Sequence, residues 1–319
     1  MTLADLVDLE VQLVRDRAAD PASLEARDRR LLPPGASARG RAAVLRGWIE
    51  ALRDQDPASP RPGRAVVSAL RAVRTVLVIA GLLLGWGTAT AVLQFTGGHP
   101  VNVWDFLLVF VGLQLALLVL LLTSLLLPLH EAGAPLLGVA RTIVGAIYRR
   151  LVVRFFRGEA RIEEWRVLWH TLRARRSLYH VVEPWILLGL TQTFGVAFNL
   201  AALAAMLRLV VFSDLAFSWS TTLLQLDSAR FHAVVGALST PWGWLWPDAV
   251  PSSALVEATR YSRLDGAYLL SGVRRTSQPA LVGGWWPFLA SSLLCYGLLP
   301  RTVLLVVSRL RASRLSPRA

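Results

Sequence analysis

Lysine is absent from this chain, and all 34 of its basic side chains are arginine. A phosphate-binding P-loop needs a lysine on the phosphates, and Schiff-base enzymes need a lysine amine. Arginine cannot take over the role of that amine, because its guanidinium stays protonated and is not a nucleophile. The absence of lysine therefore excludes both kinds of chemistry.

Cysteine and histidine, which supply many metal ligands and catalytic groups, are scarce. The single cysteine, Cys295, cannot form a disulfide within the chain or supply a cysteine-rich metal site. The five histidines are scattered, and His130-Glu131 lacks the second histidine that a zincin helix needs. Neither a Gly-x-Ser-x-Gly elbow nor a Gly-x-Gly-x-x-Gly loop occurs. We therefore predict that the protein is not an enzyme and has no catalytic residue, metal or cofactor.

Apolar residues, in contrast, make up 54% of the chain and gather in four long uncharged stretches. These stretches are Val76–Phe95, Phe106–Leu127, Trp185–Leu207 and Ala280–Leu299. Each has about 20 residues, the length that an α-helix needs to cross the hydrocarbon core of a bilayer. They lack the two-residue alternation of membrane-barrel strands. The sequence therefore predicts an all-α, multi-pass membrane protein with four transmembrane helices plus amphipathic cytoplasmic and interfacial helices.

Arginine is unevenly distributed around these four stretches. The loop 96–105 has none, ten lie between the second and third stretches, and others flank the first and last. The flanking arginines are Arg61, Arg64, Arg71, Arg74, Arg309, Arg311, Arg314 and Arg318. Because short flanks rich in arginine stay in the cytoplasm, both termini and the central basic segment are predicted to be cytoplasmic. Arg301, near the inner end of the fourth stretch, is expected to extend its stem to the headgroups.

These features divide the chain into seven segments. They are a cytoplasmic helical region and linker (1–63), a first transmembrane helical pair (64–127), an Arg-rich cytoplasmic helical hairpin (128–184), a third transmembrane helix (185–207), a periplasmic Trp-rich interfacial segment (208–279), a fourth transmembrane helix (280–308) and a basic cytoplasmic tail (309–319). In the first segment, apolar residues at helical spacing predict two helices, separated by Pro33-Pro34-Gly35. This pair of helices either docks a partner or rests on its neighbours.

The segment 128–184 combines two apolar helical stripes with clustered arginines. The candidate lipid or partner contacts are Arg149, Arg150, Arg154, Arg157, Arg173, Arg175 and Arg176. Basic amphipathic helices beside spans commonly lie along the anionic inner leaflet, so membrane lipids are the expected partner. The alternative is a hairpin packed on itself whose arginines only fix the topology. Topology also explains the net charge of +13, and no nucleic-acid-binding module is recognisable, so we expect no nucleic-acid partner.

Tryptophan is concentrated in the outer segment 208–279. A helix is predicted from Ser228 to Leu238, stopped by Pro241, with Trp242, Trp244 and Trp246 following. Tryptophans at this density favour an interfacial cap that dips into the headgroups, and a re-entrant structure is the sharper alternative. Trp104 and the pair Trp285–Trp286 are expected at the same outer interface.

Small residues recur every four positions within two of the predicted spans. The candidate helix-packing residues are Gly81, Gly85, Gly189, Thr193, Ala197 and Ala201. Small side chains let helix backbones approach closely where lipid offers no hydrophobic drive for association. The partner helix belongs either to the same chain or to a second copy, which would make a homo-oligomer.

Three amides interrupt the apolar spans: Gln114 in the second, and Gln192 and Asn199 on one face of the third. Buried amides can line a path for a polar solute, or they can hydrogen-bond across helices. A transporter more often shows charged residues or broken helices within the membrane, and the four apolar stretches contain no charge. The residues Gln114, Gln192 and Asn199 are therefore candidates for a polar path, with structural bonding as the alternative.

Four stretches together resemble a known family. They are Phe212–Leu223, Thr259–Gly266, Gly283–Leu289 and Tyr296–Arg301. With the two-span first half, they are similar to a bacterial family of uncharacterised membrane proteins, the domain of unknown function 2868. The family offers no activity, cofactor or catalytic residue to carry over. The resemblance implies an inner-membrane location and genes that tend to neighbour one for a cytoplasmic GTPase-like protein.

Two functional hypotheses follow from these observations. The first is a non-enzymatic anchor or scaffold in the inner membrane that presents its cytoplasmic helices to a soluble partner, such as a GTPase-like protein. The alternative is a small channel or transporter subunit with a polar path near Gln192 and Asn199, which would require oligomerisation because four spans rarely enclose a wide pore.

Overall fold

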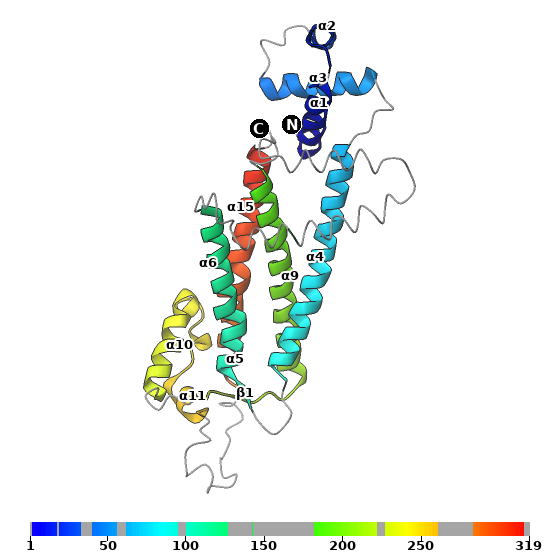
Figure 1. Ribbon diagram of the computed structural model, residues 1–319. Coiled ribbons are helices and arrows are strands. Elements are labelled where there is room, and N and C mark those ends of the chain that lie inside the picture. The colour runs from blue at the N-terminus through cyan, green and yellow to red at the C-terminus, as the bar shows by residue number, and fades with distance from the viewer. Residues whose placement is uncertain are drawn as a thin grey trace. The chain divides into compact units, whose positions relative to one another are not determined.

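The computed structural model of the chain is nearly all helical, as the sequence predicted (Figure 1). It describes residues 2–17, 19–32, 40–55, 62–94, 100–126, 142, 182–221, 227–260 and 283–315. The described chain falls into two compact units, and each is treated by itself below. The first comprises Met1–Val76, Pro128–Thr191 and Leu304–Ala319, and the second comprises Leu77–Leu127 and Gln192–Val303.

Among the described residues, four helices are long and apolar enough to cross a membrane, which agrees with the number of spans predicted. They are Val66–Val92 within α4 (Pro62–Val92), Val103–Thr123, Glu183–Phe212 (α9) and Trp286–Leu315. Two of them are composite and contain a π-helical turn. The second runs through α5 (Val103–Leu107), η2 (Leu108–Gly112) and α6 (Leu113–Leu126), and the fourth through α14 (Trp286–Ser292), η5 (Leu293–Leu298) and α15 (Leu299–Leu315).

The fourth span differs from its predicted bounds. The apolar stretch ends at Leu299, but the helix continues without interruption to Leu315. Arg301 was expected near the inner end of the span with its stem extended to the headgroups, and this stays a prediction. Its side chain bonds to Gln114 of another span, as described below.

The N-terminal region contains three helices rather than the two predicted. They are α1 (Leu3–Asp16), α2 (Pro21–Leu31) and α3 (Arg41–Gln55). The unforeseen break lies at Asp20, whose carboxylate accepts a hydrogen bond from the Ser23 N–H, and at Pro21, which occupies the first helical turn. Both are strong helix-start signals, so a new helix begins there although the apolar spacing continues.

Helix α1 packs against α3 and against the start of α4 within the first unit. Leu9, Trp48 and Ile49 form a small buried cluster between α1 and α3, and Val7 packs with Val66 of α4. The Gly63 N–H also donates to the Asp8 carboxylate at 2.7 Å. The N-terminal helices are thus fixed on the first turn of the first span.

The outer segment adds α10 (Ser228–Gly243), η4 (Pro247–Ala249) and α11 (Ser253–Ala258), and α10 packs on both α11 and α14 (Figure 1). Helix α10 was predicted to stop before Pro241, and this was wrong. Pro241 cannot donate to the carbonyl of Ala237, but the Thr240 hydroxyl donates to that oxygen at 2.8 Å. The helix therefore keeps its last turn despite the proline.

A short parallel sheet, which the sequence did not predict, joins two connecting segments of the second unit. Strand β1 (Val101–Asn102) follows α4, and strand β2 (Phe217–Ser218) follows α9. Trp219 continues this pairing through a bridge to Arg260. Backbone hydrogen bonds thereby hold together the segments that follow α4, α9 and α11.

Candidate functional site

A buried polar cluster joins three spans within the second unit. Gln114 comes from α6, Asn199 from α9 and Arg301 from α15. The Gln114 side-chain oxygen accepts hydrogen bonds from Asn199 Nδ2 at 2.9 Å and from Arg301 Nε at 3.2 Å. Asn199 also donates to the Gly195 carbonyl at 2.8 Å. The Gln114 side-chain oxygen of α6 is thus hydrogen-bonded to side chains of both α9 and α15.

Two glycines make room for these side chains. A Cβ at position 195 would lie 2.6 Å from both Cδ and Nη1 of Arg301. A Cβ at position 297 would lie 2.3 Å from the Asn199 side-chain oxygen. Because such approaches are too close for real atoms, a methyl group at either position would displace the side chain of Arg301 or of Asn199.

The protein satisfies this cluster only in part. Gln192, fully buried, has no hydrogen-bond partner for either amide atom, and the same holds for Gln114 Nε2 and Asn199 Oδ1. Across the described residues, Arg301 makes no ion pair. Each unmade buried hydrogen bond costs about 1–3 kcal/mol. Such costs favour a role beyond helix packing.

Both π-helical turns lie beside this cluster. The turn η2 ends two residues before Gln114, the turn η5 ends three residues before Arg301, and the two turns pack on each other. Pro300 lacks the N–H that would bond the carbonyl one turn earlier, which favours a widened turn at η5. Single π-helical turns occur frequently at functional sites. The sequence analysis did not predict these π-helical turns, although Pro300 could have indicated an irregular turn at η5.

The candidate helix-packing residues lie at helix contacts, and each unit has its own. In the second unit, a Cβ at Gly81 would lie 2.7 Å from the Phe194 carbonyl oxygen, and one at Gly85 would lie 2.1 Å from that of Phe198. The helix that faces α4 here is therefore α9 of the same chain. Thr193, Ala197 and Ala201 on α9 are buried. In the first unit, Gly189 lies against the buried Ser308 of α15.

The outer segment is built around a buried aromatic core. Trp219 and Trp285 are fully buried on either side of Phe231, and their indole N–H groups donate to the Val256 carbonyl at 2.7 Å and the Thr259 hydroxyl at 3.0 Å. Trp285 is expected at the level of the outer interface, and its ring is buried inside the protein, where its N–H finds a partner. Trp244, by contrast, is 79% exposed.

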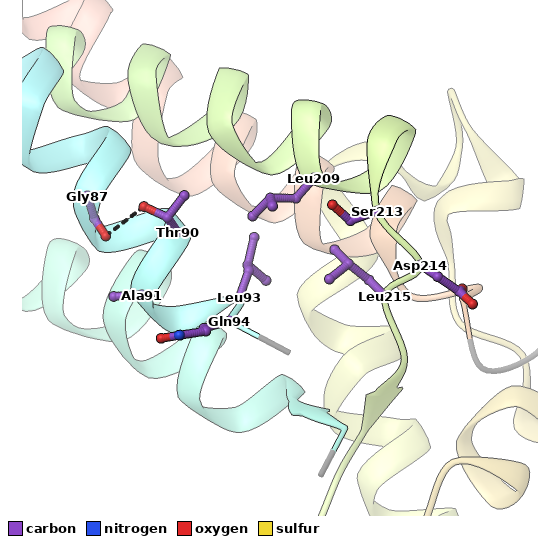
Figure 2. A pocket seen from close by; sticks show the side chains of 9 residues that line it. All are labelled: Gly87, Thr90, Ala91, Leu93, Gln94, Leu209, Ser213, Asp214 and Leu215. Atoms are coloured by element: carbon purple, nitrogen blue, oxygen red, sulfur yellow. Dashed lines mark hydrogen bonds between the residues drawn. The ribbon is translucent and has the colours of Figure 1, made fainter. Parts of the chain in front are cut away.

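A cavity of about 530 Å³ opens where α4 and α9 end in the second unit (Figure 2). It is lined by Gly87, Thr90, Ala91, Leu93, Gln94, Leu209, Ser213, Asp214 and Leu215. Leu93 and Leu215 are buried, whereas Gln94 and Asp214 are exposed. Nearby, the Arg208 guanidinium lies over the Trp86 ring at 5.5 Å. The cavity has an apolar floor and few fixed polar groups, so it offers no catalytic arrangement.

Charged groups of the N-terminal helices form the remaining candidate surface. Arg53 pairs with Asp5 and with Asp8, and Arg27 makes a two-pronged pair with Asp16. The Arg27 hydrogen bonds hold the pKa of Asp16 below its ordinary value of 3.8 despite partial burial. These pairs order the three helices rather than form a catalytic set.

The seven arginines of the predicted basic hairpin, from Arg149 to Arg176, lie outside the described residues. For the part of the chain that is described, no group of three or more histidine, cysteine, aspartate or glutamate side chains could hold a metal ion. The polar amides and the small residues predicted from the sequence are therefore the candidates that can be placed, and Arg301 is the residue that sequence reasoning missed.

Comparison with known proteins gives one match. The model of a family described as "Protein of unknown function (DUF2868)" matches residues 155–319, just over half of the chain. No curated protein and no solved structure matches the chain. The matched part contains α9, the outer segment and the fourth span, with Asn199 and Arg301. The chain therefore belongs to the DUF2868 family, as its sequence motifs had indicated.

Proposed function

We propose that this protein is a non-enzymatic anchor of the bacterial inner membrane, which holds a soluble cytoplasmic partner on its N-terminal helices. A GTPase-like protein is the partner class that the family resemblance favours. The observation that supports the proposal most is the attachment of α1 to the first turn of α4, through the Asp8–Gly63 hydrogen bond and the Val7–Val66 contact. A folded body fixed on a span suits an anchor better than a loose tail would.

The solvent-exposed side of the N-terminal helices offers a surface for that partner. Helix α2 has no buried residue and carries Arg29 and Arg30 in its last turn. Exposed leucines lie on the same three-helix region, at Leu13, Leu32 and Leu45. Exposed apolar side chains surrounded by charge are typical of protein-binding surfaces.

Affinity purification in a mild detergent tests the anchor. The wild-type chain is expected to recover one soluble protein reproducibly, and deletion of residues 1–60 should abolish that recovery. The double variant Arg30→Glu with Leu32→Glu should reduce it at least tenfold, since both side chains are exposed. Trp244→Ala, at an exposed site far along the chain, is the matched control and should leave recovery unchanged. If the wild-type chain recovers no soluble protein, the anchoring function is excluded.

A second candidate is a small channel or transporter subunit. It is favoured by Arg301, by the two amide atoms of Gln192 that lack a partner and by Asn199 Oδ1, because polar groups inside a membrane often mark a solute path. Liposomes that contain the protein should then conduct ions, and Asn199→Leu should abolish the conductance. Gly87→Ala, a change in a span with open space around the site, is the control. Equal conductance in protein-free liposomes would exclude this function.

A further inference from the structure

We propose that Arg301, Gln114, Gln192 and Asn199 form a binding site for an anionic oxygen group, a carboxylate or a phosphate, inside the second unit. The site lies in the membrane-spanning part of the chain and is independent of the anchoring function proposed above. Its ligand is either the headgroup of an anionic lipid that enters between spans or a free carboxylate or phosphate ion. Both sources present the same chemistry to Arg301.

The position of the charge is the first argument. Arg301 follows the apolar run by two residues, and at 1.5 Å per residue about 12 Å of helix separates it from the next arginine, Arg309. Its side chain is partly buried and bonds to Gln114 of another span. Across the described residues it has no carboxylate partner, and its one hydrogen bond goes to a neutral amide. A partly buried guanidinium without a carboxylate partner among the described residues can bind an anion.

The arrangement of donors is the second argument. Nε of Arg301 is bonded to Gln114, and among the described residues its two Nη groups make no hydrogen bond. A guanidinium fork suits the paired oxygens of a carboxylate or phosphate. Further donors without a partner lie on the neighbouring helices, at Gln114 Nε2 and Gln192 Nε2. Gln192 is three residues before Gly195 on α9, so it lies one turn from the point where Arg301 crosses that helix.

The fit at Gly195 is the third argument. This glycine allows Cδ and Nη1 of Arg301 to lie against the α9 backbone, where a methyl group would take their place. The unpaired oxygens Gln192 Oε1 and Asn199 Oδ1 can accept from a hydroxyl or a protonated oxygen of the ligand. A site in which a glycine makes room for a charged side chain, and in which four buried amide atoms lack hydrogen-bond partners, is arranged for a ligand.

Binding is tested on the full chain purified in a neutral detergent, in two arms. In the first, the unfolding temperature is measured against potassium acetate and potassium phosphate, with potassium chloride at equal ionic strength as the reference. In the second, native mass spectrometry counts retained phosphatidylglycerol against phosphatidylcholine. The wild-type chain is expected to show selective stabilisation in the first arm or selective retention in the second. The first result identifies a free anion and the second a lipid.

Four variants decide whether Arg301 is responsible. Arg301→Gln should weaken the selective binding at least tenfold, and Gly195→Ala should do the same by displacing the guanidinium while keeping its charge. Arg301→Lys keeps the charge without the fork and should bind with intermediate affinity. Gly87→Ala, with nothing within 4 Å of the new methyl group, is the matched control for the glycine change and should bind as the wild type does.

The result that overturns the proposal is equally defined. Binding that is absent from both arms in the wild-type chain, or undiminished in Arg301→Gln, excludes the site. Arg301→Gln is expected to fold, because Asn199 still donates to Gln114 and an uncompensated charge is removed. Without added anion, its unfolding temperature should equal or exceed that of the wild type. A lower value would instead make Arg301 a structural residue.

Discussion

At the scale of single residues, the spacing between α4 and α9 is set by the absence of a side chain. Gly85 lies so close to α9 that a Cβ would meet the Phe198 carbonyl oxygen and carbon. Gly87, two residues further along α4, has open space around it. The two positions therefore differ in the room available to a methyl group, although both are glycines of one helix.

This difference gives a direct prediction for Gly85→Ala. The methyl group must push the α9 backbone away, and overpacking of this kind costs about 1–3 kcal/mol. We expect the free energy of unfolding in detergent, measured by denaturant titration, to fall by that amount. Gly87→Ala should leave it unchanged or raise it slightly, because alanine favours the helix. Equal effects of the two changes would show that α4 and α9 do not pack through Gly85.

The residues of the polar cluster show how far sequence reasoning reaches at this scale. Gln114 and Asn199 stand out in the sequence because amides are rare in apolar runs. That they bond each other is a tertiary fact, since 85 positions separate them. Arg301 was assigned to a span end because the apolar run stops at Leu299, and local hydropathy carries no information about a side chain that turns inward to a partner.

At the scale of elements, the N-terminal helices are held together by ion pairs around a small core. The bond between Arg27 and Asp16 connects α2 to α1 at 2.9 and 2.8 Å, and it keeps the pKa of Asp16 below 3.8. Trp48 of α3 donates to Asp28 of α2 at 3.0 Å. The order of these helices therefore depends on carboxylates that remain ionised.

We predict that acid weakens this arrangement. Because the folded pKa of Asp16 is lowered, the unfolded chain takes up the proton first as the pH falls. The stabilisation from Asp16 is complete above the ordinary value of 3.8 and is lost as the pH falls through the folded pKa. Asp16→Asn should therefore lower the unfolding temperature of α1–α3 at pH 6, and the difference from the wild type should vanish at lower pH.

The measurement needs a signal from these helices alone. A fluorescent label on a cysteine introduced at the exposed Ala22, in a Cys295→Ser background, reports their unfolding. Glu25→Gln removes the exposed pair with Arg29 and is the control, since exposed pairs contribute about 0–1 kcal/mol. A pH-independent difference between Asp16→Asn and the wild type would contradict the role given to Asp16.

The elements themselves were largely predictable, and their ends were not. Four apolar runs were sufficient to predict four spans, because length and hydropathy are local properties. The break at Asp20-Pro21 and the continuation through Pro241 were both misjudged. In each case a single hydrogen bond decided the outcome: the Asp20 carboxylate capped a new helix, and the Thr240 hydroxyl met the carbonyl that Pro241 leaves free. Whether a helix ends at a proline therefore depends on whether a nearby side chain bonds the backbone groups left without a partner.

At the scale of the whole molecule, the number of spans determines which termini share a side of the membrane. With the four predicted spans, we expect both termini on the same side, and the arginine distribution predicts that this side is the cytoplasm. The sequence also predicted family membership, because its motifs lie within the matched residues 155–319. The parallel strands could not be predicted, since they join segments more than a hundred residues apart, and the aromatic core joins residues from three separate segments.

Reporter fusions test the orientation. A green fluorescent protein fused after Ala319 is expected to be fluorescent, and alkaline phosphatase fused at the same point is expected to be inactive. Alkaline phosphatase inserted between Trp244 and Leu245, at 79% and 72% exposure, should be active because it would lie in the periplasm. The inverse pattern would place both termini outside.

The pairing of Val101 with Phe217 also fixes an order of events in synthesis. The ribosome delivers Val101 more than a hundred residues before its strand partner, and Trp285 of the same aromatic core later still. The outer segment can therefore acquire its native hydrogen bonds only after the third membrane crossing is complete, and its packing only once the last helix has emerged. A nascent chain halted before Trp285 would expose an unfinished indole-lined surface, which membrane quality-control proteases could recognise.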